Sequence, residues 1–167
     1  MIAVKFPFVR IDDRLVHGQV VEGWLPYLRA DLVIVASDAA TRDETQATLM
    51  RLALPESVEL LVLGTAEAAR HPALSPGGSR RALILVPGPR EALALLEAGA
   101  RFGELNVGGL HYTAGRVQLG KAIFLSGEDK EALRRITELG VKLSGRALPA
   151  DPALDVAGLL NGEGGGR

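Results

Sequence analysis

Cysteine is absent from the 167-residue sequence, which excludes a disulfide framework and thiol chemistry. Aromatic residues make up only 4% of the chain, and Trp24 is the single tryptophan. No apolar run approaches the ~18 residues that a bilayer-spanning helix needs. The first residues lack the ordered basic, apolar and cleavage regions of a signal peptide. We therefore expect a cytoplasmic protein that does not insert into a membrane directly.

An excess of charge of one sign is also missing. The chain has 19 Lys and Arg against 20 Asp and Glu, for a formal net charge of −1, which argues against a nucleic-acid binder. Hydrophobic residues make up 47% of the chain and charged residues 23%, as in a folded globular protein. The length predicts one domain, which we place at residues 1–157. A glycine-rich tail follows at 158–167, and we expect it to be disordered.

Strand patterns alternate with helical patterns along the domain. Strands are predicted at 4–9, 31–37, 58–63, 82–86, 105–109, 121–126 and 141–147. Helices are predicted at 18–29, 43–54, 65–70, 91–98 and 128–139. In the helix at 43–54 we expect Leu49 and Leu52 to face the core. The alternation predicts the α/β class, as a three-layer α/β/α domain with an open, mainly parallel sheet.

The densest group of reactive side chains lies at residues 10–20, Arg-Ile-Asp-Asp-Arg-Leu-Val-His-Gly-Gln-Val. This stretch joins the first predicted strand to the first predicted helix. In open α/β sheets, ligands usually bind at the carboxyl ends of the strands. His17 is the one side chain here that can act as a neutral nucleophile near pH 7. Arg10 and Arg14 supply forked donors that match phosphate oxygens.

The start of the first predicted helix adds a site for an anion. Backbone N–H groups from Gly18 and Gln19 onward point back at the loop, and Gly18 permits close approach of a ligand. Asp12 or Asp13 holds the imidazole tautomer or orients an arginine. These features favour a histidine that carries a phosphoryl group. The alternative is an ordinary helix cap with a solvated Asp–Arg ion pair and a structural histidine.

Residues 10–20 resemble the phosphorylation-site signature of the IIB components of the bacterial phosphotransferase system, mannose/fructose/sorbose family. Three further stretches resemble that family at matching spacing, namely 33–38 (Val-Ile-Val-Ala-Ser-Asp), 104–112 (Glu-Leu-Asn-Val-Gly-Gly-Leu-His-Tyr) and 141–143 (Val-Lys-Leu). The likeness covers about residues 4–156, nearly the whole chain. It implies the same three-layer architecture, with a late antiparallel element.

The resemblance implies a phosphocarrier subunit of a sugar transporter, a protein-Nπ-phosphohistidine–sugar phosphotransferase without cofactor or metal. A phosphohistidine on the IIA component donates to His17, at Nδ1 by family precedent. His17 then passes the group to a sugar bound by the membrane components IIC and IID. We expect Arg14 to stabilise charge, Asp12 or Asp13 to orient the imidazole, and Arg10 to support them. The sequence is compatible with a homo-oligomer and does not identify the sugar.

Two further strand ends are candidates for supporting roles. Ser37 and Asp38 read as a helix N-cap, and in the family this strand end lies beside the phosphorylation loop. Gly108 and Gly109 form a plain turn or present N–H groups to an oxyanion. One position departs from the family pattern, since Gln46 stands where members often carry a basic residue.

Two other functions compete with sugar transfer. In the first, the protein is a regulatory switch, in which His17 is phosphorylated but no sugar accepts the group. In the second, it is a passive anion- or nucleotide-binding module. The second is disfavoured because the sequence has no phosphate-loop or dinucleotide glycine pattern. His111 is a weaker candidate phosphate carrier than His17, because nothing basic clusters with it in the sequence.

Overall fold

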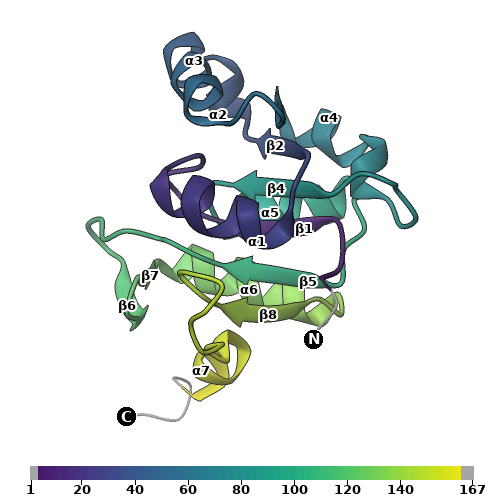
Figure 1. The fold of residues 1–167 in the computed structure, drawn as a ribbon. Coiled ribbons are helices and arrows are strands. Elements are labelled where there is room, and N and C mark those ends of the chain that lie inside the picture. Colours follow the sequence, from purple (N-terminus) through teal and green to yellow (C-terminus); the bar gives the residue numbers. More distant parts are fainter. Residues whose placement is uncertain (1–3, 163–167) are drawn as a thin grey trace.

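The computed structural model describes residues 4–162. A six-stranded sheet in the order β3-β2-β4-β1-β5-β8 forms its centre, and helices lie on both faces (Figure 1). The strands of this sheet are β1 (Phe8–Ile11), β2 (Leu32–Ala36), β3 (Glu59–Leu63), β4 (Ala82–Val86), β5 (Glu104–Val107) and β8 (Lys142–Gly145). Every neighbouring pair in it is parallel. The predicted α/β class is confirmed.

The helices divide into two groups because successive strand residues point to opposite faces. In β2, Ile34 belongs to one core cluster, whereas Val33 and Val35 belong to the other. The first cluster packs under α4 (Thr65–Ala69), η2 (Pro72–Leu74), α5 (Pro89–Glu97), α6 (Gly127–Glu138) and α7 (Val156–Gly162). The second packs under η1 (Val20–Trp24), α1 (Leu25–Leu28), α2 (Asp38–Thr41) and α3 (Glu44–Ala53). β2 and β4 are buried along their whole length, as strands covered on both faces must be.

The first helix departs from α geometry just before its proline. η1 is a π-helical turn, in which the N–H of Leu25 donates to the carbonyl of Val20. Pro26 follows and has no N–H to donate. The wider turn therefore lies next to the proline, the residue that cannot continue the hydrogen-bond ladder of the helix. This turn carries Trp24, which is buried beneath the helix.

A small antiparallel sheet follows β5 in the chain. It pairs β6 (Val117–Gly120) with β7 (Ile123–Leu125), which confirms the late antiparallel element. Leu110 bridges to Ile123, so the connection after β5 is tied to this sheet. Within residues 4–162, no helix has both the length and the apolar character that a membrane span requires.

Two predictions from the sequence were wrong. Leu49 and Leu52 are 62% and 77% exposed, because Met50 is the residue of α3 that turns towards the sheet. The tail expected to be disordered from 158 is helical as far as Gly162 in α7. Val156 and Leu160 lie four residues apart on one helical face, and both are buried. Residues 163–167 of that predicted tail lie outside the described residues.

Candidate functional site

The loop after β1 lies in the middle of the sheet, at the carboxyl ends of the strands. Its backbone is tied to both neighbouring strands. The N–H of Asp12 donates to Val86 O at 3.0 Å, and that of Asp13 donates to Gly109 O at 2.9 Å. A tight turn follows, in which Leu15 N donates to Asp12 O at 3.0 Å. Leu15 has a φ of 59°, a backbone conformation that is unfavourable for leucine. Its buried side chain anchors the loop in the core.

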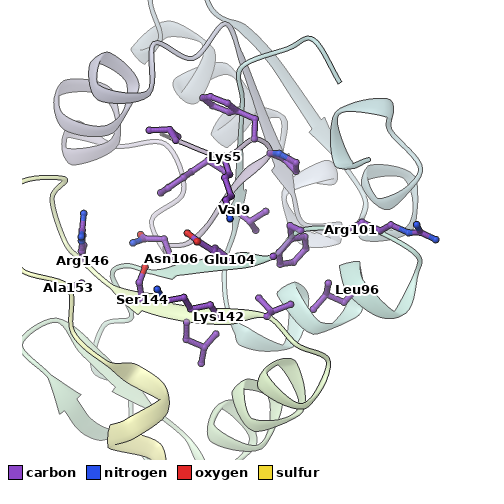
Figure 2. A pocket seen from close by; sticks show the side chains of 18 of the residues that line it. Lys5, Val9, Leu96, Arg101, Glu104, Asn106, Lys142, Ser144, Arg146 and Ala153 are labelled. Carbon is purple, nitrogen blue, oxygen red and sulfur yellow. The ribbon is translucent and has the colours of Figure 1, made fainter. Parts of the chain in front are cut away.

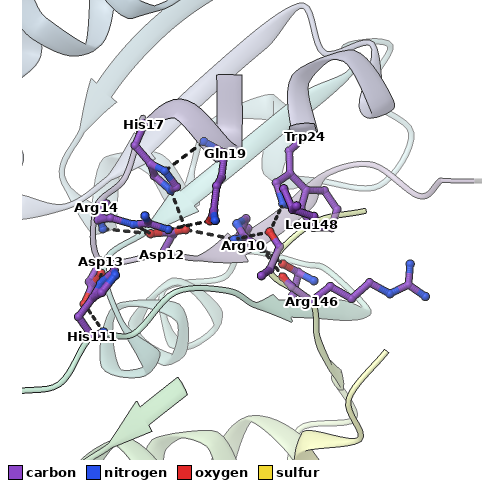
Figure 3. Close-up of polar contacts among 12 residues, drawn as sticks. Arg10, Asp12, Asp13, Arg14, His17, Gln19, Trp24, His111, Arg146 and Leu148 are labelled. Carbon is purple, nitrogen blue, oxygen red and sulfur yellow. Dashed lines mark hydrogen bonds and ion pairs between the residues drawn. The ribbon is translucent and has the colours of Figure 1, made fainter. Parts of the chain in front are cut away.

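Asp12 is the centre of the polar contacts in this loop (Figure 3). Its side chain is fully buried. Oδ2 accepts from Arg10 Nη2 at 3.1 Å and lies 2.8 Å from His17 Nε2. Oδ1 accepts from the backbone N–H of Arg14 at 3.1 Å and from its Nε at 3.4 Å. One carboxylate therefore holds three of the predicted site residues together.

The contacts of His17 determine its tautomer. An ionised carboxylate can only accept, so Nε2 of His17 carries the hydrogen that Asp12 receives. Nδ1 then has a free lone pair, towards which the N–H of Gln19 points at 3.3 Å. The imidazole is 15% exposed, so it is near the surface. The geometry therefore leaves Nδ1 as the unprotonated ring nitrogen.

Electrostatics keep Asp12 ionised. Burial alone raises the pKa of Asp12, but the hydrogen bond from His17 and the charge of Arg10 oppose this and lower it to about 2. Burial also lowers the pKa of Arg10, and the Asp12 carboxylate acts in the opposite direction. At neutral pH the site therefore holds a permanent negative charge next to Nε2 of His17.

Arg10 lies behind the loop and does not reach the surface. Its side chain is completely buried and stacks on Trp24, with Cζ 4.9 Å from the ring centroid. Besides Asp12, it donates to Asn106 Oδ1, to Arg146 O at 2.7 Å and to Ala147 O at 3.2 Å. Arg10 therefore cannot offer its guanidinium to a phosphate at the surface, and it supports the site by holding Asp12.

Arg14 is the arginine that solvent can reach. Its side chain is 39% exposed, and Nη2 donates to Gln19 Oε1 at 2.8 Å. Figure 3 shows its guanidinium on the same side of Asp12 as the imidazole of His17. The N–H of Gln19 is thus the donor next to Nδ1, and the side chain of the same residue accepts from Arg14. Gly18 is exposed, and a Cβ there would meet no atom within 4 Å, so this glycine leaves open space beside the histidine.

Asp13 binds a different histidine. Its Oδ2 accepts from the backbone N–H of His111 at 2.7 Å, and its Oδ1 lies 2.5 Å from His111 Nδ1. Arg116 lies 3.8 Å from Asp13 and 3.6 Å from Asp129. Of the two predicted orienting residues, Asp12 contacts His17, whereas Asp13 ties the loop to the segment after β5.

The two glycines after β5 make room for the arginines. The N–H of Gly108 donates to Ile11 O at 2.8 Å, so it does not face a ligand. A Cβ on Gly108 would overlap the guanidinium of Arg10, and one on Gly109 would lie 3.2 Å from Arg14 Nη2. Their role in the structure is close packing rather than the donation of N–H groups that the sequence suggested for Gly108.

The remaining predicted residues have local structural roles. Ser37 caps α2 by accepting from Ala40 N at 3.1 Å, and Asp38 accepts from Thr65 N at 2.9 Å. β4 separates their strand from β1. Gln46 lies in the first turn of α3, where its N–H donates to Asp43 Oδ1 at 2.9 Å. Among residues 4–162, no three His, Asp or Glu side chains converge in a way that would hold a metal ion.

The residues behind the loop were not predicted from the sequence. Asn106 and Trp24 are buried against Arg10, and Trp24 Nε1 donates to Ala147 O at 2.9 Å. These partners lie far from Arg10 in the sequence, so only the fold brings them together. One signal was present, since Asn106 belongs to the same short motif as the two adjacent glycines.

Known proteins are similar to this chain in both sequence and fold. The family model described as "PTS system sorbose subfamily IIB component" matches residues 6–165. The sorbose-specific EIIB component of Klebsiella pneumoniae is 31% identical over 158 residues, which cover 95% of this chain and 96% of that protein. The fructose-specific EIIB component of Bacillus subtilis is 33% identical over 153 residues, covering 90% and 93%. In the mannose-specific EIIAB component of Escherichia coli, 30% identity over 152 residues covers 91% of this chain but 47% of the relative.

Solved structures agree with the sequence relatives. The crystal structure of the IIBSor domain of the sorbose permease from Klebsiella pneumoniae superimposes with a TM-score of 0.86 at 31% identity, covering 95% of this chain and 98% of that one. An N-acetyl-galactosamine-IIB component from Streptococcus pyogenes gives a TM-score of 0.84 at 27% identity, covering 95% and 99%. The fold therefore matches these structures over almost the full length of both partners.

Proposed function

This chain belongs to the sorbose subfamily of IIB components of the sugar phosphotransferase system, and on that premise we propose that His17 is its phosphoryl carrier. IIB components of this system are phosphotransferase subunits. The chain accepts a phosphoryl group from a phosphorylated IIA component and transfers it to a sugar bound by the membrane components IIC and IID. It acts in the cytoplasm as a protein-Nπ-phosphohistidine–sugar phosphotransferase. The Escherichia coli EIIAB relative, which is named for both components, supports a IIA partner close to this domain.

The observation that carries the proposal is the contact between His17 Nε2 and Asp12 Oδ2 at 2.8 Å. It leaves the lone pair on Nδ1, the ring nitrogen that accepts a hydrogen bond from the Gln19 N–H. The lone pair attacks phosphorus, a new P–Nδ1 bond forms, and the P–N bond to the donor histidine breaks. The ring gains positive character in this step, and the buried Asp12 carboxylate stabilises it.

The loop also provides for the charge of the phosphoryl group. Once Nδ1 is bonded to phosphorus, the N–H of Gln19 can donate to a phosphoryl oxygen instead. The guanidinium of Arg14 lies beside it and bears a permanent positive charge. Both donors are at the surface, so the group is stabilised without being enclosed. An open site suits a carrier that must meet a donor protein and then an acceptor.

The onward transfer to sugar uses the same geometry. A sugar hydroxyl attacks phosphorus, the P–Nδ1 bond breaks, and the electron pair returns to His17. The hydroxyl proton leaves to a base outside this chain. The relatives are named for sorbose, fructose and mannose at 30–33% identity, which supports a sugar choice made by the membrane components rather than by this loop.

The proposal is tested by phosphorylation in vitro. The protein is incubated with enzyme I, HPr, a mannose-family IIA component and labelled phosphoenolpyruvate, beside the variants His17→Ala and His111→Ala. Acid-labile label on the wild type and on His111→Ala, with none on His17→Ala, is the expected result. Label on His17→Ala contradicts the proposal. Membranes containing IIC and IID with sugar then separate the transporter from a regulatory switch, because only the former loses its label to sugar.

A further inference from the structure

A groove opens on the second face of the sheet, beside the first helix. Figure 1 shows α1 in front of β1 and β4, with β5 and β8 next to it. Over β5 and β8 lies a cavity of about 840 Å³ (Figure 2), bounded by residues 4–7, by Trp24 and by residues 153–155. Small-molecule sites fall in the range of ~300–1,000 Å³. The groove is therefore large enough for a metabolite.

The floor of the groove is polar. Glu104 pairs in register with Lys142, and Asn106 pairs with Ser144, so four polar side chains stand on one face of β5 and β8. The residues between them, Leu105 among them, point into the core on the other face. A polar floor is a poor surface for an apolar helix and a suitable one for a hydroxylated ligand.

The floor residues have unused hydrogen-bonding capacity. Glu104 and Lys142 stand opposite each other but form no ion pair within residues 4–162. In the same part of the chain, Ser144 Oγ and the amide nitrogen of Asn106 have no hydrogen-bond partner in the protein, and neither atom is shielded from solvent. Both are therefore able to bind a ligand in the groove.

One wall of the groove is aromatic. Phe6, Phe8, Trp24 and Tyr27 line it. The ring centroids of Phe8 and Trp24 are 5.1 Å apart, and those of Trp24 and Tyr27 are 6.0 Å apart. Aromatic rings pack well against the C–H faces of a sugar ring, whose hydroxyls then point at the polar floor. This pairing of one apolar wall with several polar groups is typical of ligand sites.

The charged residues of the groove favour an anion. Its lining contains the basic residues Lys5, Arg101, Lys142 and Arg146 and the acidic residues Glu104 and Asp155. Four cations against two carboxylates leave an excess of positive charge. We propose that this groove binds a sugar monophosphate, with the sugar over the aromatic wall and the phosphate near Lys142. The choice of a phosphorylated sugar rests on the proposed function, since such a sugar is the product of the transfer.

The groove borders the phosphorylation site from behind. The side-chain Oδ1 of Asn106 accepts from Arg10, and Arg10 in turn holds Asp12. Trp24 lines the groove and stacks on Arg10. A ligand here is thus separated from Asp12 by one side chain. Trp24 is also the single tryptophan, so the intrinsic tryptophan fluorescence of the protein comes from this wall of the groove.

The test uses the His17→Ala protein, which cannot carry the proposed phosphoryl group, so binding is measured independently of transfer. It is titrated with fructose 6-phosphate, fructose 1-phosphate, mannose 6-phosphate and glucose 6-phosphate, following Trp24 fluorescence and heat of binding. Inorganic phosphate and free fructose are the control ligands. We expect saturable binding of at least one sugar phosphate, roughly tenfold tighter than of either control, because the sugar and the phosphate each make contacts that one of the controls lacks.

Variants locate the site. Lys142→Met and Ser144→Ala should each weaken binding, the former by roughly tenfold because a charge-assisted hydrogen bond is lost. Lys121→Met removes an exposed lysine outside the groove and should leave binding unchanged. Far-UV circular dichroism confirms that each variant is folded. Absence of saturable binding to all four sugar phosphates overturns the proposal. So does equal binding of inorganic phosphate, or equal affinity in Lys142→Met and Lys121→Met when Ser144→Ala is also unaffected.

Discussion

Nε2 of His17 lies 2.8 Å from Oδ2 of Asp12, and the same oxygen accepts from Arg10 at 3.1 Å. The carboxylate therefore has two functions. It holds the imidazole in the tautomer that leaves Nδ1 free, and it balances the charge of an arginine that has no access to water. The chemistry of the loop and its stability depend on one buried charge.

Replacing Asp12 should affect both properties. In Asp12→Asn, the guanidinium of Arg10 loses its only anionic partner among the described residues, and breaking such a buried pair costs about 3 kcal/mol or more. Phosphorylation should slow by at least roughly tenfold, since the hydrogen bond that orients His17 is weakened. Denaturant unfolding and the transfer assay measure the two effects. Asp13→Asn is the matched control, and equal stability of the two variants contradicts this assignment.

Acid should remove the contribution of ionised Asp12 to the free energy of unfolding. Its pKa is about 2 in the folded protein, below the ordinary 3.8, so the folded state favours the ionised form. That stability is fully present above about pH 4 and is lost as the pH falls towards the folded pKa, by about 2 kcal/mol in total. The stability gap between wild type and Asp12→Asn should therefore narrow below about pH 4. A gap that stays constant down to about pH 2.5 would show that Asp12 is not the titrating group.

Substitution by alanine should destabilise the protein at Gly108 but not at Gly18. Gly108→Ala places a methyl group on the guanidinium of Arg10, and the overpacking should destabilise the protein by about 1–3 kcal/mol. Gly18→Ala meets no neighbour within 4 Å and should fold normally. Thermal unfolding distinguishes the two. Larger residues at Gly18 should slow phosphorylation without unfolding the protein, because they fill the space next to Nδ1. Normal transfer in Gly18→Leu argues against a phosphoryl group there.

Arg14 and Arg10 should separate catalysis from stability. Arg14 is 39% exposed, so Arg14→Gln should leave the unfolding temperature nearly unchanged and reduce the phosphorylation rate by roughly tenfold or more. Arg14→Lys keeps the charge and should recover part of the rate. Arg10→Gln, in contrast, should destabilise the protein, because Arg10 is fully buried. Unchanged transfer in Arg14→Gln would remove Arg14 from the account.

His111 should affect the transfer rate by positioning Asp13, and it should not carry the phosphoryl group itself. His111→Ala removes the side-chain contact with Asp13 Oδ1 at 2.5 Å and should reduce the transfer rate a few-fold by loosening the loop. Since both groups are partly exposed, the loss of stability should stay below about 1 kcal/mol. His111→Asn can donate to the same oxygen and should restore the rate. Failure of Asn to restore it, with His111→Ala impaired, argues against the positioning role.

The sequence alone was sufficient for the architecture, because alternating apolar strands and amphipathic helices determine the layers. The proposed phosphorylation loop was also predicted from the sequence, from Arg10 near the end of the first strand and from Arg14 and His17 after it. The sequence could not show which aspartate contacts His17. Asp12 and Asp13 are the same residue type and differ only in the direction in which the loop points their side chains. The backbone at these two residues is held by hydrogen bonds from Asp12 N to Val86 O and from Asp13 N to Gly109 O, whose acceptors lie far along the chain.

The burial of Arg10 was equally hidden. Its position in β1 indicates which face it points to, but not that Asn106 and the carbonyls of Arg146 and Ala147 lie there to receive it. These residues arrive through β5 and the end of β8, about a hundred or more positions later in the chain. Long-range partners of this kind are fixed by the order of the strands, and strand order is a property of the folded sheet.

Heteronuclear NMR of the phosphorylated protein identifies the nitrogen that carries the phosphoryl group. The chain is labelled with ¹⁵N-histidine, phosphorylated through a IIA component, and examined for nitrogen–phosphorus coupling. We expect coupling at Nδ1 of His17, with Nε2 still protonated and hydrogen-bonded to Asp12. Coupling at Nε2, or at His71 or His111, would contradict the proposal.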